Sequence, residues 1–231
     1  MKKSLLITLG IALAPMAYAD NVELKTTEQK ASYTLGVDIA NNFRNQGLEI
    51  DAKAFSMGLE DALKNRKTKL TEEEMVATID ELKKSMQRKQ IDQRRAASDA
   101  NLKKGQEFLA SNAKKAGVKS LKGGIQYKVI TEGKGTSPSE TDQITAHYRG
   151  SLIDGTEFDS SYSRGKPFQF TMNSVIKGWG VALKEMKVGS KWEVYIPADM
   201  AYGKRGAGQA IGPNETLVFT IELIKVDAAK K

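Results

Sequence analysis

The hydrophobic periodicity of this chain changes at Leu121-Lys122-Gly123-Gly124, and the change separates two kinds of structure. Before these residues, apolar side chains recur every three or four positions, which is typical of one face of a helix. After them the period is two: Ile144, Ala146 and Tyr148 alternate with polar neighbours, which is typical of a half-buried strand. The sequence therefore predicts an α+β protein with helices first and an antiparallel sheet second.

The N-terminus has the three parts of a secretory signal peptide. Lys2 and Lys3 precede an apolar stretch over residues 5–14, and Ala17-Tyr18-Ala19 matches a cleavage site. The apolar stretch is too short for a membrane-spanning helix, which needs about 20 residues. A buried N-terminal helix is the alternative interpretation. We expect residues 1–19 to be removed and the mature chain to leave the cytoplasm.

Composition excludes several kinds of chemistry. The chain has no cysteine and one histidine, so an exported protein of this sequence must rely on its hydrophobic core instead of disulfides. The formal net charge is +8, but acidic and basic residues are interspersed and no basic run of the nucleic-acid-binding type occurs. We expect a solvated surface, with weak attraction to anionic surfaces as the alternative. No cofactor, no metal and no nucleic-acid partner is predicted.

Two short helices are predicted after the signal peptide. Thr26 and Gln29 form a capping-box pattern at the start of the first helix, and Gly47 fits its left-handed C-terminal cap. Asp51 fits the N-cap of the second helix. Helices of this length bury little core by themselves. We therefore expect their apolar faces, Phe43 included, to pack against a second copy of the chain; a three-helix unit within one chain is the alternative.

One long helix is predicted next. Thr71 and Glu74 form a second capping-box pattern, and neither proline nor glycine interrupts the sequence before Gly105. We expect this helix to run to about Lys115. The alternative is two helices broken near Gly105, because glycine weakens a helix interior. Residues 87–101 are mostly polar, which indicates a solvated bridge between domains that tolerates substitution.

The β-rich half has clear strand and turn signals. Strands are expected over residues 126–130, around 144–149, on both sides of an Asp154-Gly155 hairpin turn, and over 191–196 and 216–226, with a short helix over 175–184. Aromatic residues recur through this half, namely Tyr148, Phe158, Phe168, Phe170, Trp179, Tyr202 and Phe219. A concave site built from them would be apolar, and would suit binding or a reaction that needs desolvation without acid–base chemistry. A plain core is the alternative.

Five sequence blocks occur in order in this half. They are Ala146-His147-Tyr148-Arg149-Gly150, Asp154-Gly155-Thr156-Glu157-Phe158-Asp159-Ser160-Ser161, Val175-Ile176-Lys177-Gly178-Trp179, Ala201-Tyr202-Gly203 and Thr216-Leu217-Val218-Phe219. Their order resembles the FKBP family of peptidyl-prolyl cis/trans isomerases. The helical half, with Asn42-Phe43-Arg44-Asn45-Gln46-Gly47, resembles the Mip-like (macrophage infectivity potentiator) branch of that family. The resemblance covers nearly the whole mature chain.

The resemblance implies an α+β architecture in three parts. These are an N-terminal helical dimerisation domain over residues 20–70, a long linking α-helix over residues 71–120, and an FKBP-type isomerase domain over residues 121–231. In the family the last part is a half β-barrel, an antiparallel sheet wrapped around a short helix. A V-shaped homodimer joined through the N-terminal helices is also implied.

The resemblance also assigns roles to individual residues. The implied catalytic set is Tyr148, Phe158, Asp159, Ile176, Trp179, Tyr202 and Phe219, and the implied substrate-binding set is Arg164, Phe168, Val175 and Ile211. In the family pattern Trp179 forms the floor of a proline pocket, while the backbone N–H of Ile176 and the hydroxyl of Tyr202 donate to substrate carbonyls. Asp159 matches a buried acid paired with an arginine such as Arg164, and Ile211 lies in a loop overhanging the pocket.

Two further expectations follow from the same region. His147 alternates with Tyr148 along a strand, so it should face the other side of the sheet and have a structural role. The loop over residues 204–210 lacks the histidine that is common in the family, which affects substrate preference more than activity.

The resemblance implies an enzyme that assists protein folding in the cell envelope. Its expected partners are proline-containing peptides, unfolded proteins, macrolide inhibitors of the FKBP class and a second copy of itself. The expected location is the periplasm, with association with the outer membrane or exposure at the surface as alternatives. The alternative function is a dimeric holding chaperone or surface binding protein that uses the same pocket with little turnover.

Overall fold

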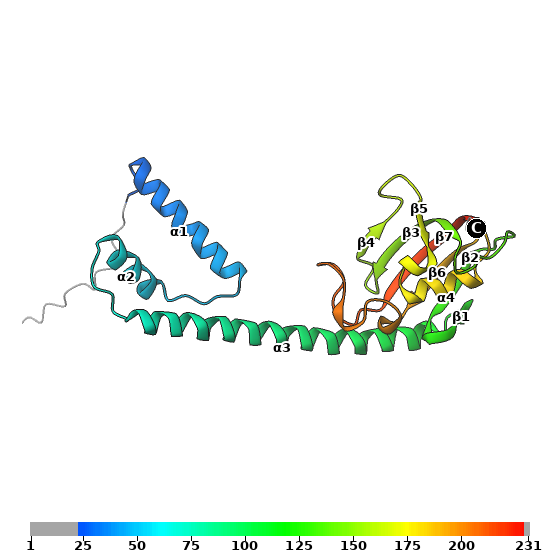
Figure 1. Cartoon of the computed structure of the whole chain (residues 1–231), viewed down its shortest axis with the longest axis horizontal. Coiled ribbons are helices and arrows are strands. Elements are labelled where there is room, and N and C mark those ends of the chain that lie inside the picture. Colours follow the sequence, from blue (N-terminus) through cyan, green and yellow to red (C-terminus); the bar gives the residue numbers. More distant parts are fainter. Residues whose placement is uncertain (1–22, 229–231) are drawn as a thin grey trace, which may run out of the picture. The chain divides into compact units, whose positions relative to one another are not determined.

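The computed structural model describes residues 23–228, so the expected signal peptide lies outside the described residues. The chain divides into two compact units, Met1–Met75 and Val76–Lys231 (Figure 1). In the part of the chain that the structure describes, no helix is both long and apolar enough to cross a membrane.

The first unit contains two helices whose ends follow the predicted signals. Helix α1 spans Thr27–Asn45, and the capping box between Thr26 and Gln29 is present. Gly47 follows α1 with φ 69°, the left-handed conformation that glycine adopts at little cost. Helix α2 spans Ala52–Leu63, and the Asp51 carboxylate accepts hydrogen bonds from two backbone N–H groups in its first turn. The local sequence chemistry therefore determines where these two helices begin and where α1 ends.

This unit buries little of its apolar surface. Phe43 and Phe55 meet edge to face, with ring centroids 5.7 Å apart. Helix α1 has no buried residue, and the only buried residue of α2 is Asp61. Large apolar side chains that remain exposed on the two helices are Tyr33, Leu35, Val37, Ile39, Phe55, Met57, Leu59 and Leu63. Helices with such a surface have an apolar face available for a partner.

The long helix α3 spans Glu72–Asn112 without interruption, so the expected single helix is confirmed and the break at Gly105 is not present. Its N-terminus carries the predicted capping box. The Thr71 backbone N–H donates to the Glu74 carboxylate at 2.8 Å, and the Glu74 backbone N–H donates to the Thr71 hydroxyl at 3.2 Å. No proline or glycine occurs in α3 before Gly105, and a single glycine is compatible with a helix that tertiary contacts support.

The second unit contains one antiparallel sheet, as the sequence predicts. Its strands are β1 (Val118–Ser120), β2 (Gln126–Thr131), β3 (Gln143–Leu152), β4 (Glu157–Ser160), β5 (Phe168–Thr171), β6 (Lys191–Ile196) and β7 (Leu217–Asp227), joined in the order β1-β2-β6-β7-β3-β4, with β5 also paired to β3. Short 3₁₀ turns lie at Lys122–Gly124, Met172–Ser174, Ala198–Met200 and Gly203–Arg205. The turn at Asp154-Gly155 joins β3 to β4, with Gly155 at φ 91°.

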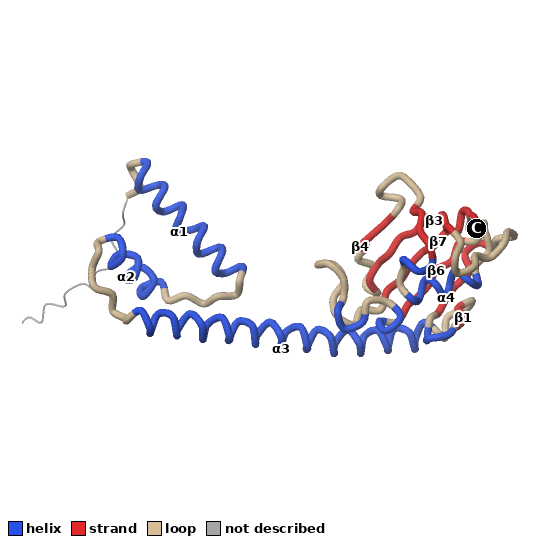
Figure 2. The backbone as a smooth tube through the Cα atoms, in the orientation of Figure 1, coloured by secondary structure: helices blue, strands red, loops and turns tan. Residues whose placement is uncertain are grey.

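Helix α4 (Lys177–Glu185) packs against this sheet, which curves around it as a half barrel (Figure 2). Side chains of β3 alternate between buried and more exposed positions, as the period of two predicts. Ile144, Leu183 and Ile221 are fully buried and come from β3, α4 and β7. The core therefore lies between the helix and the concave face of the sheet.

From Val76 onward helix α3 belongs to the second unit, and its later turns pack on the sheet of that unit, which the sequence did not predict. Phe108 contacts Tyr195 with ring centroids 5.9 Å apart, and the Asn112 amide donates to Gln126 at 3.0 Å. The segment over residues 87–101 was expected to be a solvated bridge. That expectation is wrong at Arg94, Ser98 and Asn101, whose side chains hydrogen-bond to residues 204–214 of the same unit.

Candidate active site: an aromatic pocket beside helix α4

A cavity of about 350 Å³ opens on the concave side of the sheet. Its size is within the range of small-molecule and peptide pockets. Strands β3, β4, β5 and β7, the start of α4 and the residue before the Gly203–Arg205 turn all contribute to it. The lining consists of Tyr148, Phe158, Asp159, Phe168, Ser174, Val175, Ile176, Trp179, Tyr202 and Phe219.

Trp179 is held by three other rings. It lies in the first turn of α4 and is 4% exposed. Its ring meets Tyr148 at 5.2 Å, Phe170 at 5.4 Å and Phe219 at 5.3 Å between centroids, each in an edge-to-face arrangement. Such arrangements are the favoured ones for aromatic pairs. The indole is therefore fixed in one orientation at the base of the pocket.

Gly150 makes room for the wall of the pocket. It pairs with Phe219 across the β3–β7 ladder and with Asp159 across the β3–β4 ladder. A Cβ atom on Gly150 would come within 2.7 Å of both the Phe158 and the Phe219 rings. Without that atom the two rings meet edge to face with centroids 5.6 Å apart. A glycine is therefore needed at position 150 for steric reasons, since a larger residue would displace the two rings.

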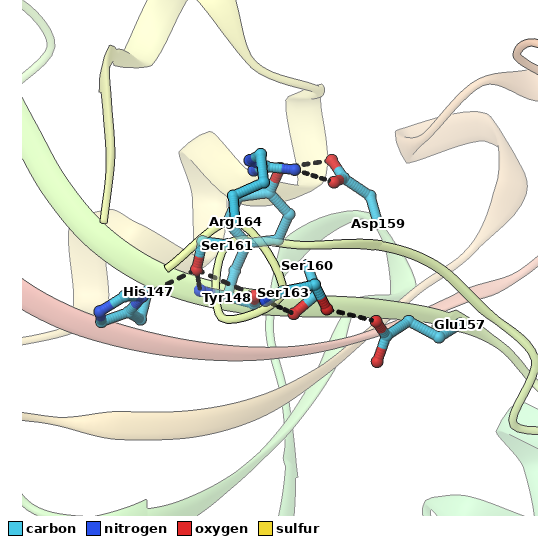
Figure 3. Close-up of polar contacts among 8 residues, drawn as sticks. All are labelled: His147, Tyr148, Glu157, Asp159, Ser160, Ser161, Ser163 and Arg164. Carbon is cyan, nitrogen blue, oxygen red and sulfur yellow. Dashed lines mark hydrogen bonds and ion pairs between the residues drawn. The ribbon is translucent and has the colours of Figure 1, made fainter. Parts of the chain in front are cut away.

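Three polar side chains join at the rim. The Tyr148 hydroxyl donates to the Asp159 carboxylate, and Arg164 forms an ion pair with the other oxygen of that carboxylate (Figure 3). Arg164 also donates to the Tyr148 hydroxyl at 2.8 Å. Each member of this set therefore has two partners, which fixes the Tyr148 ring against Trp179.

The charges at the site are settled by these contacts. Burial alone would raise the pKa of Asp159, but the hydrogen bonds from Tyr148 and Arg164 outweigh it and hold the pKa below its ordinary value. Burial, and then the hydrogen bond to Asp159, raises the pKa of Tyr148. Burial, and then the charge of Asp159, raises the pKa of Tyr202. At neutral pH the pocket has one ionised carboxylate and two neutral phenols, so no lining residue is poised to exchange a proton.

The Trp179 indole N–H at the floor of the pocket is buried without an acceptor, and two further donors at the pocket also have none in residues 23–228. One is the backbone N–H of Ile176, the residue that precedes α4. The other is the hydroxyl of Tyr202, whose side chain lines the pocket and which is 40% exposed as a residue. Backbone and hydroxyl donors are normally paired when they are removed from water. These two are available to carbonyl groups of a bound peptide.

His147 lies outside the pocket, as its place in the strand predicts. Its Nδ1 atom is 2.9 Å from the Ser161 hydroxyl, and its ring stacks on Tyr162 at 4.6 Å between centroids. Figure 3 shows the imidazole directed away from Asp159 and Arg164. Ser161 also accepts the Tyr148 backbone N–H at 2.8 Å. The histidine thus supports the backbone behind the pocket and cannot act on a bound substrate.

Most of the residues implied by the family resemblance line this one cavity. Two do not. Arg164 contacts the lining only through Tyr148 and Asp159, and Ile211 is 8% exposed within the hydrophobic core next to the pocket walls. Sequence reasoning missed Ser174, which lines the cavity and donates its hydroxyl to the Thr171 carbonyl at 2.8 Å. Its position directly before Val175 was the only available signal.

A second hollow, of about 430 Å³, lies between α3 and the turn that joins β3 to β4. Its lining includes charged side chains of both signs, namely Lys104, Glu107, Asp154 and Glu215. It has no cluster of aromatic rings, so it does not match the predicted apolar site. Among residues 23–228 there is also no cluster of side chains suited to a metal ion.

Two family models match the chain. One, described as FKBP-type peptidyl-prolyl cis-trans isomerase, matches residues 134–224, which include the whole lining of the aromatic pocket. The other, described as the domain amino terminal to FKBP-type peptidyl-prolyl isomerase, matches residues 28–129.

Curated relatives match over almost their full length. The peptidyl-prolyl cis-trans isomerase Mip of Coxiella burnetii is 44% identical over 98% of this chain and 99% of the relative. The outer membrane protein MIP of Legionella longbeachae is 42% identical over 96% of this chain and 95% of the relative.

A solved structure supports the same relationship. The crystal structure of FkpA from Escherichia coli matches with a TM-score of 0.78 and 35% identity, and the match covers 90% of this chain and 100% of FkpA. The fold, the family models and the full-length relatives agree with the five sequence blocks. The chain belongs to the family of FKBP-type peptidyl-prolyl cis-trans isomerases.

Proposed function

We propose that the aromatic pocket accelerates rotation about X-Pro bonds by favouring the twisted amide over the planar one. Rotation has a barrier of about 18–20 kcal/mol because resonance gives the C–N bond partial double-bond character. Water stabilises the planar, polar amide, whereas the twisted form has lost much of its dipole. A dry aromatic site therefore stabilises the transition state more than the ground state. Each ~1.4 kcal/mol of that difference is a tenfold gain in rate.

In this proposal the proline ring rests on Trp179 and is enclosed by the surrounding walls. Those walls are Tyr148, Phe158, Phe168, Val175, Ile176 and Phe219. The Ile176 backbone N–H and the Tyr202 hydroxyl donate to carbonyl groups on either side of the proline. The observation that carries these roles is that the Ile176 N–H and the Tyr202 hydroxyl, both at a largely aromatic pocket, have no acceptor within residues 23–228.

Asp159 and Arg164 have a positioning role in the proposal. Their ion pair and their bonds to the Tyr148 hydroxyl keep that ring edge-on to Trp179. The carboxylate stays ionised and the phenol stays neutral at neutral pH, so the set holds a wall in place without transferring a proton.

The two buried tryptophans provide a matched test of the pocket. Trp179 and Trp192 are 4% and 5% exposed, but only Trp179 lines the cavity. Trp192 stacks on Tyr127 at 4.2 Å on another part of the sheet. We expect Trp179→Phe to lower kcat/KM for a proline tetrapeptide by about tenfold or more, whereas Trp192→Phe leaves it near the wild-type value. Equal turnover in the two variants would contradict the assignment.

We further propose that the chain is a homodimer joined through the helical domain, with the domain boundaries expected from the sequence. The support is the apolar surface of α1 and α2, where Leu35, Leu59 and Leu63 are more than half exposed. A second copy would cover that surface. Sedimentation of a chain that lacks residues 20–70 tests this: a monomer is expected, and a dimer would place the interface elsewhere.

Any part of that surface that the second copy leaves uncovered favours a second role beside catalysis. We propose that unfolded client proteins bind there and present their proline residues to the pocket. Two pockets in one dimer would also raise the effective concentration of catalyst on a single client. An aggregation assay with the pocket blocked by a macrolide inhibitor of the FKBP class separates the roles. Holding activity should persist while peptide turnover stops.

Localisation in the cell envelope is the last part of the proposal. It rests on the signal-peptide pattern of residues 1–19 and on the relative named outer membrane protein MIP. The expected location is the periplasm, with outer-membrane association as the alternative. Fractionation of whole cells distinguishes the two, and recovery of the protein in the cytoplasm would contradict both.

A further inference from the structure

One loop continues the chain directly from the pocket residue Tyr202. It comprises residues 203–214 and is named here the 203–214 loop; it begins directly after Tyr202 and contains Ile211. The backbone N–H of Asn214 donates to the Gly203 carbonyl at 2.9 Å and closes the base of the loop. Ala207 and Ile211 exchange two backbone hydrogen bonds, at 2.9 and 3.1 Å. The loop is therefore closed at its base and bridged in its middle by its own backbone hydrogen bonds.

One stripe of helix α3 lies along this loop. The stripe consists of Arg94, Ser98, Asn101 and Gly105, which share one face because they are four, three and four residues apart. Gly105 is buried at the end of the stripe, where an added Cβ atom would overlap the Thr216 hydroxyl. The glycine lets the helix backbone approach the start of β7 closely.

Three side chains of the stripe hydrogen-bond to the loop. Arg94 donates to the Arg205 carbonyl at 2.6 Å and approaches the Lys204 carbonyl at 3.4 Å. Asn101 donates to the Pro213 carbonyl at 3.0 Å. The Asn214 amide donates to the Ser98 hydroxyl at 2.8 Å. Both ends of the loop are thus tied to α3.

These hydrogen bonds hold the loop backbone in place, and the residues that form them lie outside the hydrophobic core. Arg94 and Asn101 donate to main-chain carbonyls, so they depend on where the loop backbone lies and not on which side chains it carries. Arg94 bonds to the last residue of the Gly203–Arg205 turn, three residues after Tyr202. None of the three stripe residues belongs to the hydrophobic core.

We propose that α3 is a brace that positions the 203–214 loop, and with it the Tyr202 hydroxyl, over the proline pocket. Arg94, Ser98 and Asn101 are then positioning residues for the isomerase reaction, although none of them touches the pocket. The inference rests on the proposed donor role of Tyr202. Its hydroxyl has no partner of its own within residues 23–228, so its place over the substrate depends on the backbone that follows it.

The chain offers matched controls for a test in the full-length protein. Arg95 is the next residue of the same helix, is exposed, and forms no hydrogen bond or ion pair with the loop in the described part of the chain. Ser111 is an exposed serine of α3 beyond the stripe. We compare Arg94→Ala with Arg95→Ala, and Ser98→Ala with Ser111→Ala. Arg94→Lys keeps the charge and should recover part of any loss.

The first readout is kcat and KM for a series of Xaa-Pro tetrapeptides, together with amide hydrogen exchange of the 203–214 loop. Arg94→Ala should lower kcat/KM by about two- to tenfold, the effect of losing one hydrogen bond. It should also accelerate exchange in the loop, with a melting temperature close to that of Arg95→Ala. If Arg94→Ala and Arg95→Ala match in turnover and in exchange, the brace is refuted.

The second readout is a double-mutant cycle between Arg94→Ala and Tyr202→Phe. If the brace acts through Tyr202, the loss caused by Arg94→Ala should be much smaller in the Tyr202→Phe background. Fully additive losses would contradict the route through Tyr202. Tyr202→Phe alone tests the donor role separately. If Tyr202→Phe leaves kcat/KM unchanged while Arg94→Ala lowers it, the donor role of Tyr202 is contradicted and the brace on the loop is supported.

Discussion

Replacing Gly105 by alanine tests how closely α3 packs on the isomerase domain. An alanine in a helix interior is favoured over glycine by about 1 kcal/mol. Here the added Cβ atom would overlap the Thr216 hydroxyl and lie 3.1 Å from the Thr216 Cβ atom. Thr216 is 3% exposed and β-branched, so its side chain has little freedom to turn away. Overpacking of this kind costs about 1–3 kcal/mol. The net expectation is a loss of stability of up to about 2 kcal/mol.

Gly180 provides the control, because it lies inside α4 and an added Cβ atom would meet nothing within 4 Å. Gly180→Ala should therefore stabilise the protein by about 1 kcal/mol. Adding Thr216→Ala to Gly105→Ala removes the overlapping hydroxyl and should restore part of the loss. Urea unfolding of the full chain measures all of these changes. The reasoning is refuted if Gly105→Ala stabilises the protein as much as Gly180→Ala does.

Three further changes have expected outcomes. The pKa of Asp159 in the folded chain lies below its value in the unfolded chain, so the ionised carboxylate stabilises the fold above the unfolded pKa, and this contribution is lost as pH falls through the folded pKa. The difference in unfolding free energy between wild type and Asp159→Asn should therefore shrink below about pH 4. A difference that stays constant with pH would contradict this expectation. A chain without residues 20–70 should keep wild-type turnover of short peptides but refold proline-limited proteins more slowly, whereas loss of peptide turnover would show that the pocket needs the deleted segment. Gln93 is exposed and lies beside the bracing stripe of α3, not in it, so Gln93→Ala should change the free energy of unfolding by no more than about 0.5 kcal/mol. Gln93→Pro should lower it by about 3 kcal/mol. Thermal or urea unfolding measures both changes.

Local rules predicted the helix ends and the strand pattern. Thr26, Asp51 and Thr71 cap their helices as expected, because a cap depends on residues only two or three positions away. The alternation of buried residues in β3 likewise needs only the period of a strand. Strands β1 and β5 were not predicted. They contain three and four residues, which is too few for a periodic signal.

Predicting the site from the sequence required the order of five sequence blocks, because the site residues are brought together only by long-range strand pairing. Gly150 and Phe219 are brought together by the β3–β7 ladder, which no local pattern encodes. The contact between α3 and the 203–214 loop was missed for a different reason. Its members, Arg94, Ser98, Asn101 and Gly105, recur at helical spacing but are polar or lack a side chain. A search for hydrophobic periodicity does not detect such a stripe.

The central claim is that the pocket catalyses rotation without proton transfer, and the pH dependence of kcat/KM tests it most directly. The pKa of Asp159 is lowered, and the pKa values of Tyr148 and Tyr202 are raised, so no lining residue should change its charge between about pH 5 and about pH 9. The profile for an uncharged proline peptide should be flat over that range. A bell-shaped profile with inflections inside it would reveal an essential acid or base and contradict the account.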